Sequence, residues 1–205
     1  MTRGNGESQV QSIEELVQRI QGGEAAAFEG IYQRFFDPIY RYILFRISDQ
    51  TSAEDLTQEV FLKALQSINS FRWRGFPFSS WLFRIAHNLV VDSFRHKSRE
   101  RWVQLDLTEE TPSPDVDQHL ELKLTMEQVK RLMKNLTEAQ REVISLRFAA
   151  GLSVGEVARA VGKRENAVKA LQHAGIVKLR NAIQSKGEKL YFKGKASGIR
   201  DETVL

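Results

Sequence analysis

The chain of 205 residues contains no cysteine, only four prolines and no long apolar run. The absence of cysteine excludes disulfide bonds and thiolate metal sites on this chain, and it suits a reducing cytoplasm. No stretch approaches the ~18 apolar residues that predict a membrane span, so we expect no membrane insertion. The first residues, MTRGNGESQVQS, are polar and lack the apolar core of a signal peptide. These absences predict a cytoplasmic protein.

The groups that carry catalysis are also scarce. The four histidines do not have the spacing of a metal site, and the chain lacks a P-loop. Its glycine-rich stretches precede no predicted strand, which argues against a dinucleotide-binding fold. We therefore expect no metal, no cofactor and no enzymatic activity. The histidines are His87, His96, His119 and His173.

What the chain does contain is helical periodicity in two blocks. Apolar residues recur at helical spacing through 12–98 and 120–185, and no segment alternates like a strand. Residues 102–122 hold six acidic residues and no lysine or arginine, which is typical of a linker. The predicted fold is all-α: two small helical domains, joined by an acidic flexible linker, with a helix-turn-helix in the second. The predicted divisions are a disordered 1–11, a first domain 12–98, a linker 99–119, a second domain 120–185 and a mobile tail 186–205.

Side chains that can cap helices mark several predicted helix starts. We expect Thr51 or Ser52 to cap one helix, and Ser79 or Ser80 to cap another that ends near Phe94. Three further starts carry a capping box, in which a hydroxyl and a Glu or Gln three residues later satisfy each other's backbone N–H. The capping boxes are Ser12 with Glu15, Thr137 with Gln140, and Ser153 with Glu156.

The stretch SVGEVARAVGKRENAVKALQH, residues 153–173, predicts a helix-turn-helix. That motif needs a small residue where its helices cross, a glycine in the turn and an apolar residue pointing back. Ala158, Gly162 and Val168 have the required spacing. Residues 159–180 hold six basic residues and one acidic residue, so we favour DNA binding over the alternative of a helical hairpin with a solvated basic face. The candidate contacts to DNA are Lys163, Arg164, Asn166, Lys169 and His173.

The stretch FRWRGFPFSSW, residues 71–81, combines five aromatic residues with two arginines, a glycine and a proline. Such a mixture suits unpaired bases, because rings stack on bases and guanidinium groups bind phosphate. The alternative is that some of these rings belong to the core, with Phe71 and Trp81 closing and opening the flanking helices. The stretch alone leaves both interpretations open.

The helix before it carries an acidic face. In SAEDLTQEVF, residues Asp55, Gln58 and Glu59 are spaced i, i+3, i+4 and share one side. One interpretation is simply that acidic residues are favourable near a helix N-terminus. The other is a docking face for a basic partner. Physical chemistry alone favours the first.

Four blocks in order resemble a known family: AFEGIYQRFFDPIYRYI, SAEDLTQEVFLKAL, FSSWLFRIAHNLVVD and LTEAQREVISLRFAAGLSVGEVARAVGKRENAVKAL. Over residues 24–183 the chain resembles a bacterial RNA polymerase sigma factor of the extracytoplasmic-function (ECF) subfamily, in its minimal two-domain form. The resemblance implies that the chain binds core RNA polymerase, recognises the −35 and −10 promoter elements and directs initiation. An anti-sigma factor is a further expected partner.

The resemblance also implies roles for residues. It changes our preference for the acidic face, because Asp55, Gln58 and Glu59 match the residues that hold core polymerase. The recognition helix, about residues 165–180, reads duplex DNA at the −35 element through the candidates named above. Single-stranded −10 DNA is expected to bind the loop 69–78 and the following helix, through Arg72, Trp73, Arg74, Phe76, Phe78, Trp81, Arg84, Asn88 and Asp92.

The chain departs from the family in two places. His87 stands where the family often has arginine. Leu171, Ala174, Gly175 and Ile176 stand late in the recognition helix, where many members carry arginines. A glycine inside a helix costs about 1 kcal/mol relative to alanine.

Two other hypotheses compete with this one. A stand-alone helix-turn-helix repressor or activator would account for residues 137–180, but it would leave the acidic face and the aromatic stretch unexplained. It would also bind duplex DNA without polymerase. An enzyme is the least favoured, for want of catalytic groups.

Overall fold

The computed structural model describes residues 11–47, 49–73, 75–103, 129 and 131–196, with side chains for all of these except 97–103 and 185–196. The described residues form helices, turns and irregular segments, with no strand among them, so the expected all-α fold is confirmed. The longer helices are α1 (Ile13–Gln21), α2 (Phe28–Ile47), α3 (Gln50–Ser67), α4 (Phe78–Val103), α6 (Glu138–Ile144), α7 (Val154–Ala160) and α8 (Glu165–Ala196). Short turns are η1 (Ala25–Ala27), η2 (Ile68–Ser70) and the π-helical η3 (Ser145–Ala149).

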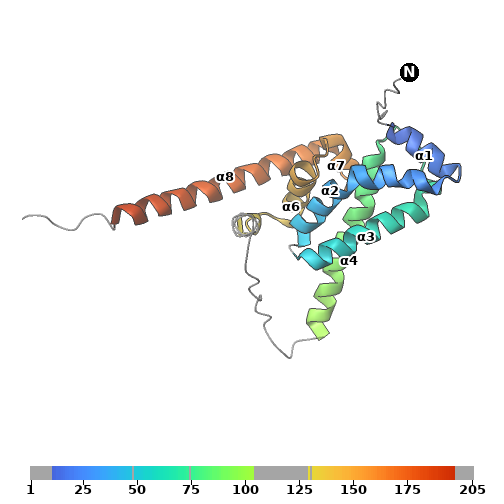
Figure 1. Cartoon of the computed structure of the whole chain (residues 1–205). Helices are drawn as coiled ribbons and strands as arrows, with labels where there is room; N and C mark the ends of the chain where they lie inside the picture. The colour runs from blue at the N-terminus through green and yellow to red at the C-terminus, as the bar shows by residue number, and fades with distance from the viewer. Residues whose placement is uncertain (1–10, 48, 74, 104–128, 130, 197–205) are drawn as a thin grey trace, which may run out of the picture.

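Helices α1 to α4 pack as the first domain (Figure 1). The capping box at the start of α1 is present: the Glu15 N–H donates to Ser12 Oγ (3.1 Å) and the Ser12 N–H donates to Glu15 Oε2 (2.9 Å). The domain's buried cluster includes Ile31, Tyr42 and Phe83, none of them more than 1% exposed. The buried apolar residues of α2 recur at helical spacing, as the sequence pattern predicted.

Two predicted caps are wrong. Asp49 caps α3 by accepting a hydrogen bond from the Ser52 N–H (2.8 Å), so neither Thr51 nor Ser52 has that role. Helix α4 begins at Phe78, which places Ser79 and Ser80 inside its first turn, and it continues to Val103 instead of ending near Phe94. Both serines are buried, 8% and 4% exposed, because the second domain covers this end of α4.

The second domain contains the predicted helix-turn-helix, in α7 and α8. Ala158 is 4% exposed and Val168 is fully buried where the two helices cross. Gly162 has φ +66° in the turn between them, a left-handed conformation that glycine adopts without a Cβ penalty. The capping boxes at Thr137 and Ser153 are both present. Helix α8 extends to Ala196, so part of the expected mobile tail is helical (Figure 1).

Gly175 has a packing role in α8. A Cβ built at this position would lie 3.0 Å from Ile144 Cγ1 and 3.3 Å from its Cδ1. The glycine therefore lets α8 approach α6 closely. This contact explains why a residue with low helix propensity occurs inside the helix.

The two domains are docked against each other. Helix α7 packs on α4, and η3 packs on α2. One continuous buried cluster includes Tyr42 and Phe83 from the first domain and Leu146 and Val157 from the second. The sequence had predicted two domains and a linker, but not this contact. Of the linker, residues 104–119 lie outside the described part of the chain, as do residues 1–10.

Candidate nucleic-acid and polymerase interface

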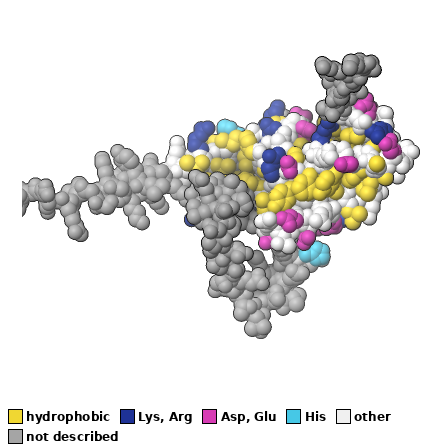
Figure 2. Space-filling model, viewed as in Figure 1, with side chains coloured by type: hydrophobic (Ala, Val, Ile, Leu, Met, Phe, Trp, Pro, Cys, Tyr) yellow, Lys and Arg dark blue, Asp and Glu magenta, His cyan; other side chains and the backbone are white. Residues whose placement is uncertain are grey.

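The predicted docking face on α3 is accessible. Asp55 and Gln58 are exposed, and the Glu59 side chain is 44% exposed and lies 3.1 Å from Lys63 Nζ. Leu62, one turn further on the same side, is 56% exposed. Figure 2 shows an apolar band over α2 and α3 with acidic side chains along its border. A helix face that combines exposed apolar and acidic side chains suits a partner that offers apolar and basic groups.

The rings of the aromatic stretch divide into two groups. Phe71 and Phe78 are buried, 6% and 1% exposed, with their ring centroids 5.3 Å apart. Trp81 is half-buried, with its centroid 5.2 Å from each of them. Trp73 and Phe76 are 41% and 48% exposed. The predicted binding role of Phe78 is therefore not available in this conformation, in which Phe78 supports the loop from beneath.

The polar candidates lie around these exposed rings. Arg84, Asn88 and Asp92 are exposed on α4 and follow Trp81 at helical spacing, so they continue one face. Asp92 Oδ1 lies 3.4 Å from Arg95 Nη1. Arg72 Nη1 donates to the carbonyls of Asn69 (2.6 Å) and Phe71 (2.8 Å). Arg74 lies outside the described residues.

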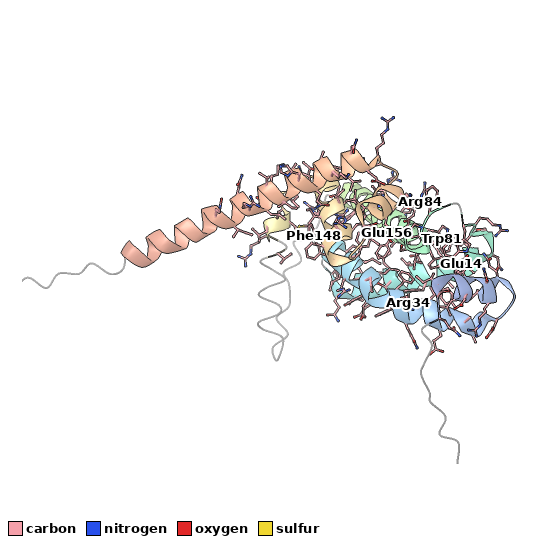
Figure 3. All side chains as sticks on the ribbon, turned by 90° about the horizontal axis from the view of Figure 1, so that it is seen from above. Glu14, Arg34, Trp81, Arg84, Phe148 and Glu156 are labelled. Carbon is pink, nitrogen blue, oxygen red and sulfur yellow. The ribbon has the colours of Figure 1, made fainter. Side chains whose placement is uncertain are left out.

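A cavity of about 450 Å³ opens at this place. It is lined by residues of the first domain and by Arg159 of α7, whose guanidinium carbon lies 4.3 Å from the centre of the Phe76 ring. Figure 3 shows Trp81, Arg84 and Glu156 near one another, where α7 meets α4. Arg159 lies in the basic segment 159–180, but nothing local in the sequence links it to Phe76, so it was not among the predicted site residues.

The helix-turn-helix presents its basic side to solvent. The predicted DNA contacts are all exposed, in the turn before α8 and on its first turns, while Val168 faces the core. All five side chains carry hydrogen-bond donors suited to phosphate or base edges, and Asn166 and His173 can also accept. The predicted residues are Lys163, Arg164, Asn166, Lys169 and His173.

Comparisons with known proteins decide the family. The profile described as Sigma-70 region 2 matches residues 31–100, and that described as Sigma-70, region 4 matches residues 132–181. The chain is 31% identical over 174 residues to the ECF RNA polymerase sigma factor SigX of Bacillus subtilis. This alignment covers 80% of this chain and 87% of SigX. This chain belongs to the ECF sigma factors. The ECF sigma factor BldN of Streptomyces coelicolor is 42% identical over 166 residues, covering 79% of this chain and 62% of BldN.

Solved structures share the fold of this ECF sigma factor. CnrH, in complex with the cytosolic domain of CnrY, has a TM-score of 0.67 and 22% identity, covering 83% of this chain and 96% of CnrH. The sigma factor RpoE, in complex with the anti-sigma factor NepR from Bartonella quintana, has a TM-score of 0.63 and 23% identity, covering 77% of this chain and 96% of RpoE. At these identities the likeness shows the arrangement of helices.

A buried charge cluster joins the two domains of the sigma factor. Glu142 of α6 accepts a hydrogen bond from the Tyr42 hydroxyl (2.6 Å), and His87 Nδ1 lies 2.8 Å from the same carboxylate oxygen. Arg46 Nε lies 2.8 Å from the other oxygen, and Arg46 also contacts Glu138. The Arg46 and Glu142 side chains are 1% and 8% exposed. His87, the departure from the family's usual arginine, thus faces an acidic partner across the interface.

These contacts shift the pKa of the groups involved. Burial alone would raise the pKa of Glu142, but the hydrogen bond from His87 and the charge of Arg46 outweigh it and hold that pKa below its usual value. Burial, and then the neighbouring Glu142 charge, raise the pKa of Tyr42 well above its usual value. Glu142 is therefore ionised at neutral pH and pairs with a buried arginine.

An apolar groove of about 600 Å³ lies beside this cluster, between α6, η3 and α8. Phe45 of α2 lines it together with Phe148 and Ile183, which are 61% and 56% exposed. Within the described part of the chain no helix could cross a membrane, and no group of three His, Cys, Asp or Glu side chains could hold a metal ion.

Proposed function

We propose that this chain directs promoter-specific transcription initiation as a non-catalytic subunit of RNA polymerase in the cytoplasm. The observation that carries this proposal is that exposed rings beside arginines, a basic helix-turn-helix and an exposed acidic and apolar helix face occur in one chain. A repressor needs only the second of these three surfaces. Together they suit a protein that joins an enzyme to DNA at two elements.

The first domain supplies the contact to single-stranded DNA at the −10 element. Extruding a base from duplex DNA costs a few kcal/mol. Stacking on an aromatic side chain is worth about 1–3 kcal/mol per base. Trp73 and Phe76 offer two exposed rings, and Arg84 offers a guanidinium for the backbone, so this surface can offset most of the cost of opening.

The second domain supplies the contact to duplex DNA at the −35 element. Its recognition helix, the first turns of α8, carries Asn166 and Lys169 on the exposed side, and Arg164 is exposed directly before the helix begins. Arginine and lysine read guanine edges or bind phosphate, and asparagine reads adenine. Gly175 and its neighbours face α6 and the groove, so we assign the DNA contacts to the N-terminal part of α8.

The docked arrangement is a resting form in this proposal. Arg159 stacks on the Phe76 ring and α7 packs against the start of α4, so the −35 domain contacts part of the −10 surface. Promoter binding therefore requires the domains to separate. Binding of core polymerase to the acidic face of α3 leaves the docked interface free to open, because the two surfaces involve different residues.

An anti-sigma factor is a further proposed partner. The structural relatives CnrH and RpoE were solved in complex with the cytosolic domain of CnrY and with the anti-sigma factor NepR, respectively. The groove between α6 and α8 is lined mainly by apolar side chains, which suits the apolar face of an amphipathic helix. We propose that an anti-sigma factor holds the domains docked by binding this groove.

Two variants test the division of labour. Asp55→Lys reverses a charge on the exposed face of α3 and should abolish binding to core polymerase while leaving the circular dichroism spectrum unchanged. Arg164→Ala should weaken recognition of the −35 element and preserve core binding. Measured together by core-binding and promoter-binding assays, parallel losses in both variants would contradict the assignment of the two surfaces.

A further inference from the structure

The cavity between the domains has a cationic lining. Arg72, Arg84 and Arg159 reach it from the loop before α4, from α4 and from α7, and none of its lining residues is acidic. Among the described residues Arg84 has no hydrogen bond or ion pair, and Arg159 has only its contact with the Phe76 ring. Glu156, which lies on α7 with Arg159, already accepts hydrogen bonds from the Ser79 hydroxyl and the Ser153 N–H. The three guanidinium groups are exposed and have no acidic partner in the cavity lining, so together they can bind an anion.

The same cavity has aromatic walls and an unpaired hydroxyl. Phe76 and Trp81 line it. So does Ser80, which is 4% exposed and whose Oγ has no hydrogen-bond partner. A buried polar atom left without a partner is unfavourable. The first turn of α4 also lines the cavity, and the positive end of a helix dipole favours a negatively charged group there.

We propose that this cavity binds a free nucleotide. Its phosphates would lie among the three arginines and its base against Phe76 or Trp81. Ser80 Oγ, which protein atoms enclose in this structure, would pair with a polar group of the base or sugar once the side chain rotates toward the cavity. The volume of about 450 Å³ lies within the range of small-molecule sites, roughly 300–1,000 Å³. A simple inorganic anion would use the arginines but leave the rings and the serine without a partner.

The site exists only while the domains are docked, because Arg159 belongs to the second domain. A ligand that binds only one of two states raises the population of that state, and the effect grows as the ligand concentration exceeds its Kd. A bound nucleotide therefore holds the domains together. It also occupies Arg72, Phe76, Trp81 and Arg84, which the proposed function assigns to −10 DNA. This second consequence rests on the proposed function, whereas nucleotide binding itself does not.

The test uses the purified full chain without polymerase. Titration calorimetry with ATP, GTP, CTP and UTP, with inorganic phosphate and with a short single-stranded oligonucleotide compares the possible sources of the same chemistry. We expect at least one nucleotide to bind with a Kd at least tenfold lower than that of inorganic phosphate. Arg159→Ala should weaken nucleotide binding at least tenfold. Arg34→Ala, which removes an exposed arginine on α2 away from the cavity (Figure 3), should not.

Three results would overturn the proposal. The first is that no nucleotide binds. The second is that inorganic phosphate binds as tightly as a nucleotide, which would mean that the rings contribute nothing. The third is that nucleotide binding survives Arg159→Ala unchanged, which would place the ligand on the first domain alone, like −10 DNA. Circular dichroism of both variants separates loss of binding from loss of folding. Because polymerase is absent, failure here leaves the proposed role in initiation untouched.

Discussion

Glu142→Gln should separate the two domains without unfolding them. The substitution preserves the shape of the side chain and its acceptor for the Tyr42 hydroxyl, but it removes the charge that faces Arg46. Arg46 is 1% exposed in its side chain, so it cannot recover solvation while the domains stay docked. Removing one partner of a buried ion pair costs about 3–5 kcal/mol. Because Glu138 still contacts Arg46, we take the lower end.

A loss of about 3 kcal/mol lowers the docking equilibrium constant by roughly a hundredfold, since about 1.4 kcal/mol is a factor of ten. The absence of native cysteine allows a clean assay. Fluorophores attached through Gln18→Cys on α1 and Lys178→Cys on α8, both exposed positions, report the distance between the domains by energy transfer. We expect the efficiency to fall in Glu142→Gln.

The matched control is Glu138→Gln. Glu138 contacts the same Arg46, but its side chain is 63% exposed, so its loss should cost about 1 kcal/mol or less. Equal effects of the two substitutions, or unchanged energy transfer in Glu142→Gln, would show that the buried pair of Arg46 and Glu142 does not hold the domains together. A loss of helical circular dichroism would mean instead that Glu142 maintains the fold of the second domain.

Three further predictions concern the same structure. Docking should weaken as the pH falls below 4.5, the ordinary pKa of a glutamate, because the docked state holds the pKa of Glu142 lower and favours its charged form. Energy transfer between the domains that stays constant until Glu142 is fully protonated would contradict this. Gly175→Leu should lower the free energy of unfolding by about 1–3 kcal/mol in urea denaturation, since its side chain meets Ile144, and an unchanged midpoint would show that α8 can move away. Asp49→Ala should cost about 1 kcal/mol by removing the cap of α3, whereas Thr51→Ala should cost less; the reverse order would restore the cap first expected from the sequence.

Features that depend on neighbours in the chain could be predicted from the sequence. The helix-turn-helix follows from the spacing of Ala158, Gly162 and Val168, and each capping box needs only two residues three positions apart. The face of Asp55, Gln58 and Glu59 follows from helical geometry alone. The functional meaning of that face, in contrast, came from the resemblance to a family and not from its physical chemistry.

Features that depend on docking could not be predicted. Arg46 and Glu142 are nearly a hundred positions apart in the sequence, and no local pattern shows that both become buried. The contact of Arg159 with Phe76 has the same origin. Ser79 was expected to cap a helix, because a serine before an apolar run usually does so. The second domain instead offers it Glu156 as a partner, and α4 already begins at Phe78.

The most direct measurement of the central claim is transcription from a promoter library by purified core RNA polymerase with and without this chain. We predict that the chain binds core polymerase and adds specific start sites, and that Asp55→Lys loses both abilities. Tight binding of the isolated chain to duplex DNA, with neither core binding nor specific initiation, would contradict the account and favour a stand-alone helix-turn-helix regulator.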